Sequence, residues 1–121
     1  MIQVDVDESL NLFKITYEGN VDWAQASASR IKVKKLLPKL KPDFVILADL
    51  TALKHMDVSC APEVQAVMDM FQEKGVAKII RVIPDPKKDI GFKLMSAFHY
   101  SDNVTIITCE TLDQAQKKLS A

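Results

Sequence analysis

The chain has 121 residues, of which 48% are hydrophobic and 26% charged, a balance typical of one ordinary globular domain. Its 16 basic and 16 acidic residues give a formal net charge of zero, so the overall charge does not indicate binding to nucleic acid, an anionic membrane or an acidic substrate. No apolar run approaches the roughly 20 residues that span a bilayer, and the alternating N-terminus is no signal peptide. We therefore expect a cytoplasmic protein in which Cys60 and Cys109 are reduced thiols.

The first two elements are predicted to be strands over residues 2–6 and 10–17 that form a hairpin, because hydrophobic and polar residues alternate in both. The side chains expected to face the core are Ile2, Val4, Val6, Leu10 and Leu12, with Phe13 and Ile15 as further candidates.

A helix is predicted to begin at Asp22, whose carboxylate can form a capping box with Gln25. Its buried stripe is expected to hold Ala24, Ala28 and Ile31, and two prolines mark its exit. The basic side chains that follow are interpreted as a solvated helix face, with a weak contact to anionic lipid or nucleic acid as the alternative; they are Arg30, Lys32, Lys34, Lys35, Lys39 and Lys41.

Residues 43–49 form a nearly unbroken apolar run, which indicates a strand covered on both faces. A polar loop, "KHMDVSCA", is expected to connect this strand to an amphipathic helix over 62–74 that ends at Gly75. Met70 lies toward the edge of the apolar stripe of that helix and is a candidate for a partner surface.

The remaining pattern predicts strands over 77–83 and 103–108 and helices over 87–98 and 111–119. Thr111 and Gln114 suggest a second capping box, and Leu112, Ala115 and Leu119 are expected to share one face of the last helix. The order β-β-α-β-α-β-α-β-α predicts an α/β fold, in which one domain over 1–121 holds a mixed, largely parallel five-stranded sheet with four helices packed on it.

Motifs for catalysis and cofactor binding are absent from the sequence. The chain has 3 glycines, widely spaced, so no phosphate-cradling loop exists. His55 and His99 are not spaced with the cysteines like a zinc site, and no nucleophile elbow occurs. We therefore predict no catalytic residue, no cofactor and no metal.

Four residues around the polar loop have a structural and a functional interpretation. Asp49 is expected to cap a loop N–H near the strand end, and Asp57 and Ser59 to cap the following helix. Cys60 is interpreted as a small buried hydrophobe, with activation of its thiol by the helix N-terminus as the alternative. We predict that it is not catalytic and that its pKa lies within about one unit of the ~8.5 reference value.

The stretch from Val45 to Ile83, "VILADLTALKHMDVSCAPEVQAVMDMFQEKGVAKIIRVI", resembles the STAS domain, the family of sulfate transporters and anti-sigma factor antagonists. Asp49-Leu50 matches the end of the family's strand, Met56 to Cys60 fall on its D-S-S/T-G loop, and Gly75 matches the glycine before its next strand. In members regulated by phosphorylation, the serine directly after the loop aspartate accepts the phosphate. Here Val58 occupies that position and Cys60 replaces the glycine.

The resemblance implies a non-enzymatic regulatory module that binds a protein partner, such as an anti-sigma kinase or a scaffold, without nucleic acid and without an integral membrane segment. The predicted partner-binding residues are Asp57, Val58, Ser59, Cys60 and Glu63, and Ser59 is the candidate phosphorylation site. The alternatives left open are a small enzyme or redox protein that uses Cys60 and a small-ligand or lipid-binding module. A homodimer is also left open.

Overall fold

The computed structural model describes residues 1–83 and 103–120. Its strands form one 5-stranded sheet in the order β1-β2-β3-β4-β5, with bounds Ile2–Asp7, Leu12–Val21, Val45–Met56, Lys78–Val82 and Thr105–Cys109. β1 pairs with β2 antiparallel, and each later pair is parallel. The predicted mixed, largely parallel sheet is thus confirmed.

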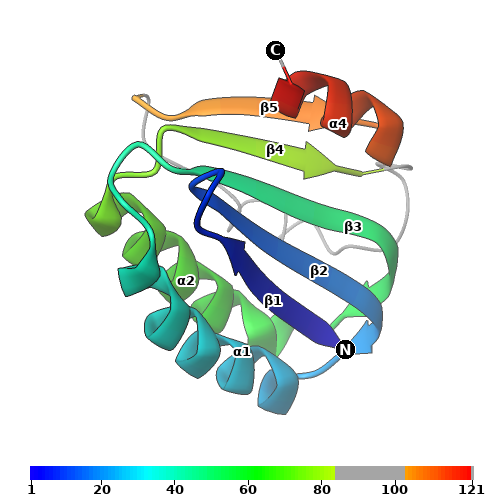
Figure 1. Ribbon diagram of the computed structural model, residues 1–121. Coiled ribbons are helices and arrows are strands. Elements are labelled where there is room, and N and C mark those ends of the chain that lie inside the picture. The colour runs from blue at the N-terminus through cyan, green and yellow to red at the C-terminus, as the bar shows by residue number, and fades with distance from the viewer. Residues whose placement is uncertain (84–102, 121) are drawn as a thin grey trace.

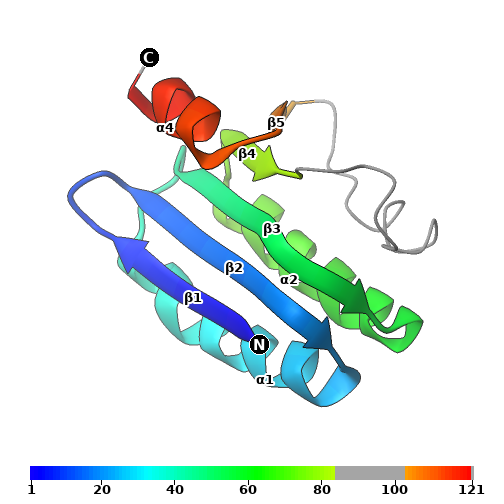
Figure 2. The same ribbon diagram turned by 90° about the vertical axis from the view of Figure 1, so that its right-hand side faces the viewer.

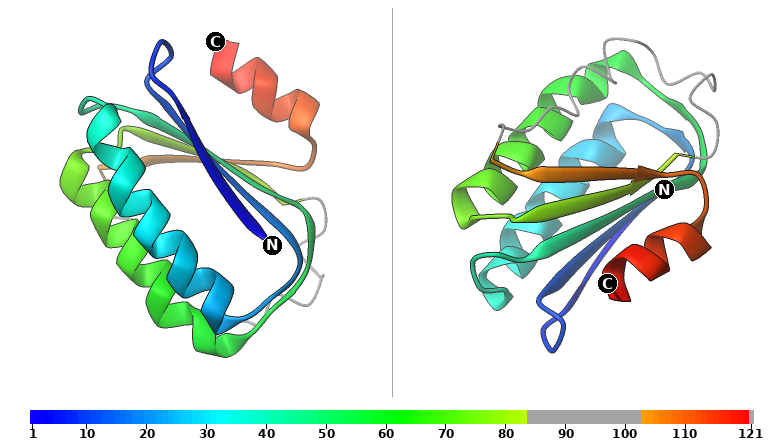
Figure 3. Two further views of the ribbon diagram at one scale, coloured as in Figure 1. Left: turned by 60° about the horizontal axis from the view of Figure 1, so that its bottom comes forward. Right: turned by 90° about the horizontal axis from the view of Figure 1, so that it is seen from above.

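The helices lie on both faces of this sheet. α1 (Trp23–Leu36) and α2 (Ala61–Lys74) lie side by side on one face, and α4 (Leu112–Ser120) lies on the other, next to β4 and β5 (Figures 1, 2 and 3). There are two single 3-10 turns among the described residues. The turn η1 (Leu37–Lys39) directly follows α1, and the turn η2 (Val58–Cys60) directly precedes α2. The predicted helix over 87–98 lies outside the described residues.

The main core fills the space between the sheet and the pair α1 and α2. Phe71 of α2 makes edge-to-face contacts with Phe13 of β2 and with Phe44, at ring-centroid distances of 5.0 and 6.1 Å. A smaller cluster under α4 includes Leu47 and Ala115. Because Ile46 faces the main core and Leu47 the smaller cluster, β3 is covered on both faces, as predicted.

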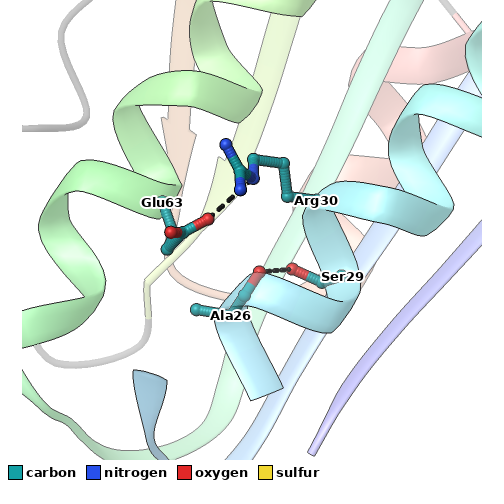
Figure 4. A network of polar contacts seen from close by, with 4 residues as sticks. All are labelled: Ala26, Ser29, Arg30 and Glu63. Atoms are coloured by element: carbon teal, nitrogen blue, oxygen red, sulfur yellow. Dashed lines mark hydrogen bonds and ion pairs between the residues drawn. The ribbon is translucent and has the colours of Figure 1, made fainter. Parts of the chain in front are cut away.

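α1 begins as predicted but turns a different face to the core. Both halves of the capping box form: Gln25 N–H donates to Asp22 Oδ1 at 2.9 Å, and Asp22 N–H donates to Gln25 Oε1 at 3.3 Å. The predicted buried stripe of Ala24, Ala28 and Ile31 is wrong, since all three are exposed, and the buried residues are Ala26, Ser29 and Val33. The buried Ser29 hydroxyl is satisfied because it donates to the Ala26 carbonyl at 2.7 Å (Figure 4).

β3 is longer than predicted, because it continues past Asp49 to Met56. Thr16 and Glu18 of β2 pair with Asp49 and Ala52, so β3 contains one extra residue there, and a second extra residue follows Leu53. At the first of these bulges, Asp49 Oδ1 accepts the Thr51 N–H at 2.9 Å and the Thr51 hydroxyl at 2.7 Å. Asp49 therefore caps an N–H, but inside the strand rather than near its end.

Three smaller expectations met different outcomes. Leu10 was predicted to be inward but is 66% exposed, because it precedes β2 in the turn of the hairpin. α2 ends as predicted at Gly75, which adopts the left-handed conformation with φ +97°. In α4, Ala115 is buried and Leu119 half-buried as expected, but Leu112 is 41% exposed.

The capping box predicted for α4 forms in part. Thr111 Oγ1 accepts the Gln114 N–H at 3.2 Å, as expected. The Gln114 side chain, however, accepts the N–H of Glu110 at 2.9 Å rather than that of Thr111.

Candidate functional site

The segment 57–60 lies where β2 and β3 end and where α1 and α2 begin, so four elements meet around it. Its backbone is fixed at both ends. The Asp57 N–H donates to the Val21 carbonyl, the last residue of β2, at 3.0 Å, and the Cys60 N–H donates to the Asp57 carbonyl at 2.9 Å. The segment is therefore an ordered turn whose backbone is held in place by a hydrogen bond to β2.

Asp57 caps the 3-10 turn η2 rather than α2, the helix that the sequence predicted it to cap. Its Oδ1 accepts the Ser59 N–H at 2.9 Å. Hydrogen bonds from the Ser59 backbone and side chain lower the pKa of the Asp57 carboxyl, so it is charged at neutral pH. The cap of α2 predicted at Ser59 is wrong: Cys60 occupies the N-cap and makes no side-chain capping bond. A 3-10 turn precedes α2, and Pro62 in its first turn has no N–H to cap.

The outer face of the turn combines charge with an exposed apolar side chain. Asp57, Val58 and Ser59 are all exposed, and the Val58 side chain remains 51% exposed. Sequence reasoning missed Trp23, which is 52% exposed at the first position of α1, the helix that contacts η2. A signal was available: it is the single tryptophan of the chain, and it directly follows the predicted N-cap. Tryptophan is enriched at protein interfaces.

Cys60 lies beneath this face. The side chain is 0% exposed, and its Sγ lies 3.8 Å from the Val21 carbonyl oxygen. Burial raises the pKa of the Cys60 thiol, and the charges of Asp57 and Asp22 raise it further. The thiol is thus held in its neutral, unreactive form.

Glu63 points toward α1 rather than outward. Its carboxylate is almost fully buried, and Arg30 Nε lies 2.8 Å from Oε2 (Figure 4). Oε2 has no aligned hydrogen bond among the described residues, so the contact is mainly one of opposite charges. The Arg30 side chain is 46% exposed, which leaves the pair partly screened by water. Of the five predicted partner-binding residues, Cys60 and Glu63 therefore lie below the exposed surface.

Within residues 1–83 and 103–120, no group of three or more histidine, cysteine, aspartate or glutamate side chains is placed to hold a metal ion. No helix in this part of the chain is long and apolar enough to cross a membrane.

The sequence matches no protein-family model and no curated protein. Solved structures match throughout the chain at low identity. The anti-sigma factor antagonist SpoIIAA in its unphosphorylated form is 15% identical, with TM-score 0.68 over 100% of this chain and 99% of that one. The phosphorylated form of SpoIIAA, a Bacillus cell fate determinant, is 17% identical, with TM-score 0.64 over 98% and 99%.

Two further structures share the arrangement. An anti-sigma factor antagonist from Mycobacterium paratuberculosis is 12% identical, with TM-score 0.60 over 100% of this chain and 94% of that chain. A protein of the DUF3478 family from Shewanella loihica, with a SpoIIAA-like fold, is also 12% identical, with TM-score 0.62 over 98% and 92%. The chain therefore has the STAS fold of anti-sigma factor antagonists. The SpoIIAA structures share this fold over their full length, and the fold predicted from the sequence is confirmed.

Proposed function

We propose that residues 1–121 act as one cytoplasmic, non-enzymatic STAS-like domain that regulates a partner protein by binding it. The partner class is an anti-sigma kinase-like or scaffold protein. Support comes from the fold shared with anti-sigma factor antagonists and from the segment 57–60, which presents an exposed surface on a fixed backbone. A fixed backbone favours binding because little conformational entropy is lost when the partner docks.

The observation that carries this proposal is Val58. A valine that is 51% exposed at the centre of a hydrogen-bonded turn gains little inside its own protein, but it can be desolvated by a partner. Trp23 is a second exposed apolar side chain, at the start of α1, the helix that contacts η2, and Asp57 and Ser59 supply polar contacts. Cys60 and Glu63 contribute from below, by anchoring the turn to Val21 and by joining α2 to Arg30.

The partner-binding surface is proposed to work without phosphorylation at the position after the loop aspartate, because Val58 has no hydroxyl. Ser59 is exposed, but its N–H and side chain already bond to Asp57. A phosphate there would add about −1.5 to −2 charges beside that carboxylate. Phosphorylation of Ser59 would therefore strain the turn rather than stabilise it.

The test begins with affinity capture from the native cell, identification of the partner by mass spectrometry and purification of the pair. Calorimetry then compares two variants that place a carboxylate on an exposed apolar position: Val58→Asp and Leu10→Asp. Leu10 is 66% exposed in the β1–β2 turn, at the other end of the strands. We expect Val58→Asp to weaken binding at least about tenfold, ~1.4 kcal/mol, and Leu10→Asp to leave it unchanged.

Equal affinities for the two variants would show that the turn is not the binding surface. Intact-mass measurement and peptide mapping of the protein from its own cell test the regulatory part separately. Stoichiometric phosphate on Ser59 would contradict unregulated binding while leaving the binding surface in place. The redox alternative needs a reactive thiol, and the burial of Cys60 with its raised pKa argues against one.

A further inference from the structure

A second surface lies away from the turn, along the line where α1 and α2 pack together. Two adjoining hollows of about 490 and 380 Å³ share Lys34, Met70 and Glu73, so they form one open groove. We call it the α1–α2 groove; its lining is completed by Arg30, Ile31, Leu37, Pro38, Ala66 and Lys74. None of these residues belongs to the segment 57–60.

The floor of the α1–α2 groove is apolar. Leu37 is buried, Met70 and Ala66 are half-buried, and Ile31 on the α1 side is 55% exposed. The face of α1 that the sequence assigned to the core thus lies partly along this groove. Exposed apolar side chains of this size next to a hollow are typical of a surface that a partner covers.

The rim of the groove is basic. Its lining holds the cations of Arg30, Lys34 and Lys74 and a single carboxylate, that of Glu73. α1 itself contains no acidic residue. The whole chain has a formal net charge of zero, so this basic surface results from segregation of charge rather than from an excess. Arg30 is matched by Glu63, which leaves the cations of Lys34 and Lys74 and the carboxylate of Glu73, a net charge of +1 for a ligand to meet.

We propose that the α1–α2 groove binds an acidic amphipathic helix of a partner protein. Apolar side chains spaced i, i+3/i+4 and i+7 on that helix would lie over Ile31 and Met70, and its flanking carboxylates would pair with Lys34 and Lys74. From Arg30 to Pro38 the α1 side extends about 12 Å, which matches roughly two helical turns.

The shape and chemistry favour this occupant over two others. The hollows beside the half-buried Met70 and Ala66 can receive side chains that project from a helix, whereas an anionic bilayer is usually met by about 4–8 Lys and Arg, more than the three in this lining. Among the residues that the structure describes, no aromatic ring on which a base could stack lines the groove, so a nucleic acid would find cations but no base contact there. The inference goes beyond the proposed function because it needs no residue of the turn.

The probe is a stapled helical peptide of about four turns, roughly 15 residues, with leucine on one face and glutamate on both flanks. Its match is the same peptide with lysine in place of glutamate. Each peptide is titrated into the isotopically labelled full chain, and NMR follows the chemical shifts. Only the acidic peptide should produce saturable chemical-shift changes at residues along the groove. Added salt should weaken this binding.

Ile31→Asp and Lys34→Glu should each reduce the affinity for the acidic peptide at least tenfold. Both change exposed side chains, so the fold is retained. Lys14→Glu, on an exposed position of β2, is the matched control and should have no effect. Val58→Asp should also leave peptide binding unchanged, which separates the groove from the turn.

Several results would overturn the proposal: equal binding of the two peptides, absence of saturable shifts, shifts that map outside the groove, or unchanged affinity in Ile31→Asp. If the protein binds neither peptide but co-sediments with phosphatidylglycerol vesicles, and Ile31→Asp abolishes this co-sedimentation, the groove binds membranes instead. A dimer in sedimentation analysis that Ile31→Asp dissociates would assign it to self-association.

Discussion

Cys60 illustrates how surroundings decide the chemistry of a single residue. From its place at the start of a helix, the thiol has two opposite interpretations, since a helix N-terminus lowers a thiol pKa and burial raises it. In the structure the side chain is fully buried and faces the Val21 carbonyl, and three carboxylates, those of Asp57, Asp22 and Glu63, act on its thiol. Burial and negative charge both raise the pKa of the thiol, and together they outweigh the backbone hydrogen bond with Asp57, which lowers it.

We predict that Cys60 reacts slowly with iodoacetamide in the native protein. The pKa of its thiol is raised by folding, so its contribution to stability is present below the unfolded pKa of ~8.5 and is lost as pH rises beyond that value. Alkylation rates measured from pH 6 to 10 in Cys109→Ala, with the same variant in denaturant as control, should show a higher midpoint in the native state. If the alkylation rate of the native protein has its pH midpoint below about 6.5, the enzyme interpretation would be favoured.

Arg30 and Glu63 show a residue-level interaction that no sequence pattern announced. They are 33 positions apart, and neither belongs to a motif; the contact follows from the packing of α1 beside α2. A carboxylate as buried as Glu63 needs a partner, because an unpaired charge in the interior is strongly unfavourable.

At the scale of elements, we predict that this ion pair couples α1 to α2. Arg30→Met should destabilise the protein because it leaves Glu63 buried without its cation, and adding Glu63→Gln should recover part of the loss. The coupling in a double-mutant cycle should lie near the lower end of about 0.5–3 kcal/mol, since Arg30 is half exposed. Urea unfolding of the four proteins measures it. Additive effects within error would mean that the pair contributes nothing.

The start of α1 was predictable from sequence, whereas its buried face was not. Asp22 and Gln25 are three residues apart and interact locally, so their capping box forms wherever a helix begins. The buried face depends on which side the sheet covers, and α1 offers alanine and serine all around instead of a clear apolar stripe. Packing therefore selected Ala26, Ser29 and Val33, a face that includes a serine.

The second half of β3 was missed for a related reason. Its buried residues Leu50, Leu53 and Met56 are spaced by three, which fits neither the alternation of a strand nor the stripe of a helix. Two bulges explain the spacing, because each inserts one residue between inward-facing positions. A bulge depends on pairing with the neighbouring strand, and that information is absent from the local sequence.

For the molecule as a whole, the order and type of the described elements were predictable because apolar runs, turns and caps repeat in a regular α/β alternation. The turn at 57–60 was predictable as a location, since Asp57 and Gly75 flank a strongly amphipathic helix. Its tertiary surroundings were not: the packing of α1 against the turn, and the inward orientation of Glu63, follow from the meeting of β2, β3, α1 and α2.

We predict that Phe71 determines global stability more than any surface residue near the proposed sites. Its ring contacts both Phe13 and Phe44 and is 2% exposed, so Phe71→Ala should leave a cavity at the centre of the main core. The expected loss is about 3–5 kcal/mol in urea unfolding. Leu112→Ala, at a position 41% exposed, is the control and should change stability by less than about 1 kcal/mol. A small effect of Phe71→Ala would mean that the core can repack around the gap.

The bulged half of β3 also limits how this protein can diversify. Removal of one residue between Leu50 and Met56 would abolish one of the two bulges, and with it the local bend and twist that bring the end of β3 and Asp57 to the Val21 carbonyl. We therefore expect natural selection to remove insertions and deletions between Leu50 and Met56. Descendants of this chain can acquire a new recognition preference at the turn chiefly by substitution at exposed positions such as Val58 and Ser59.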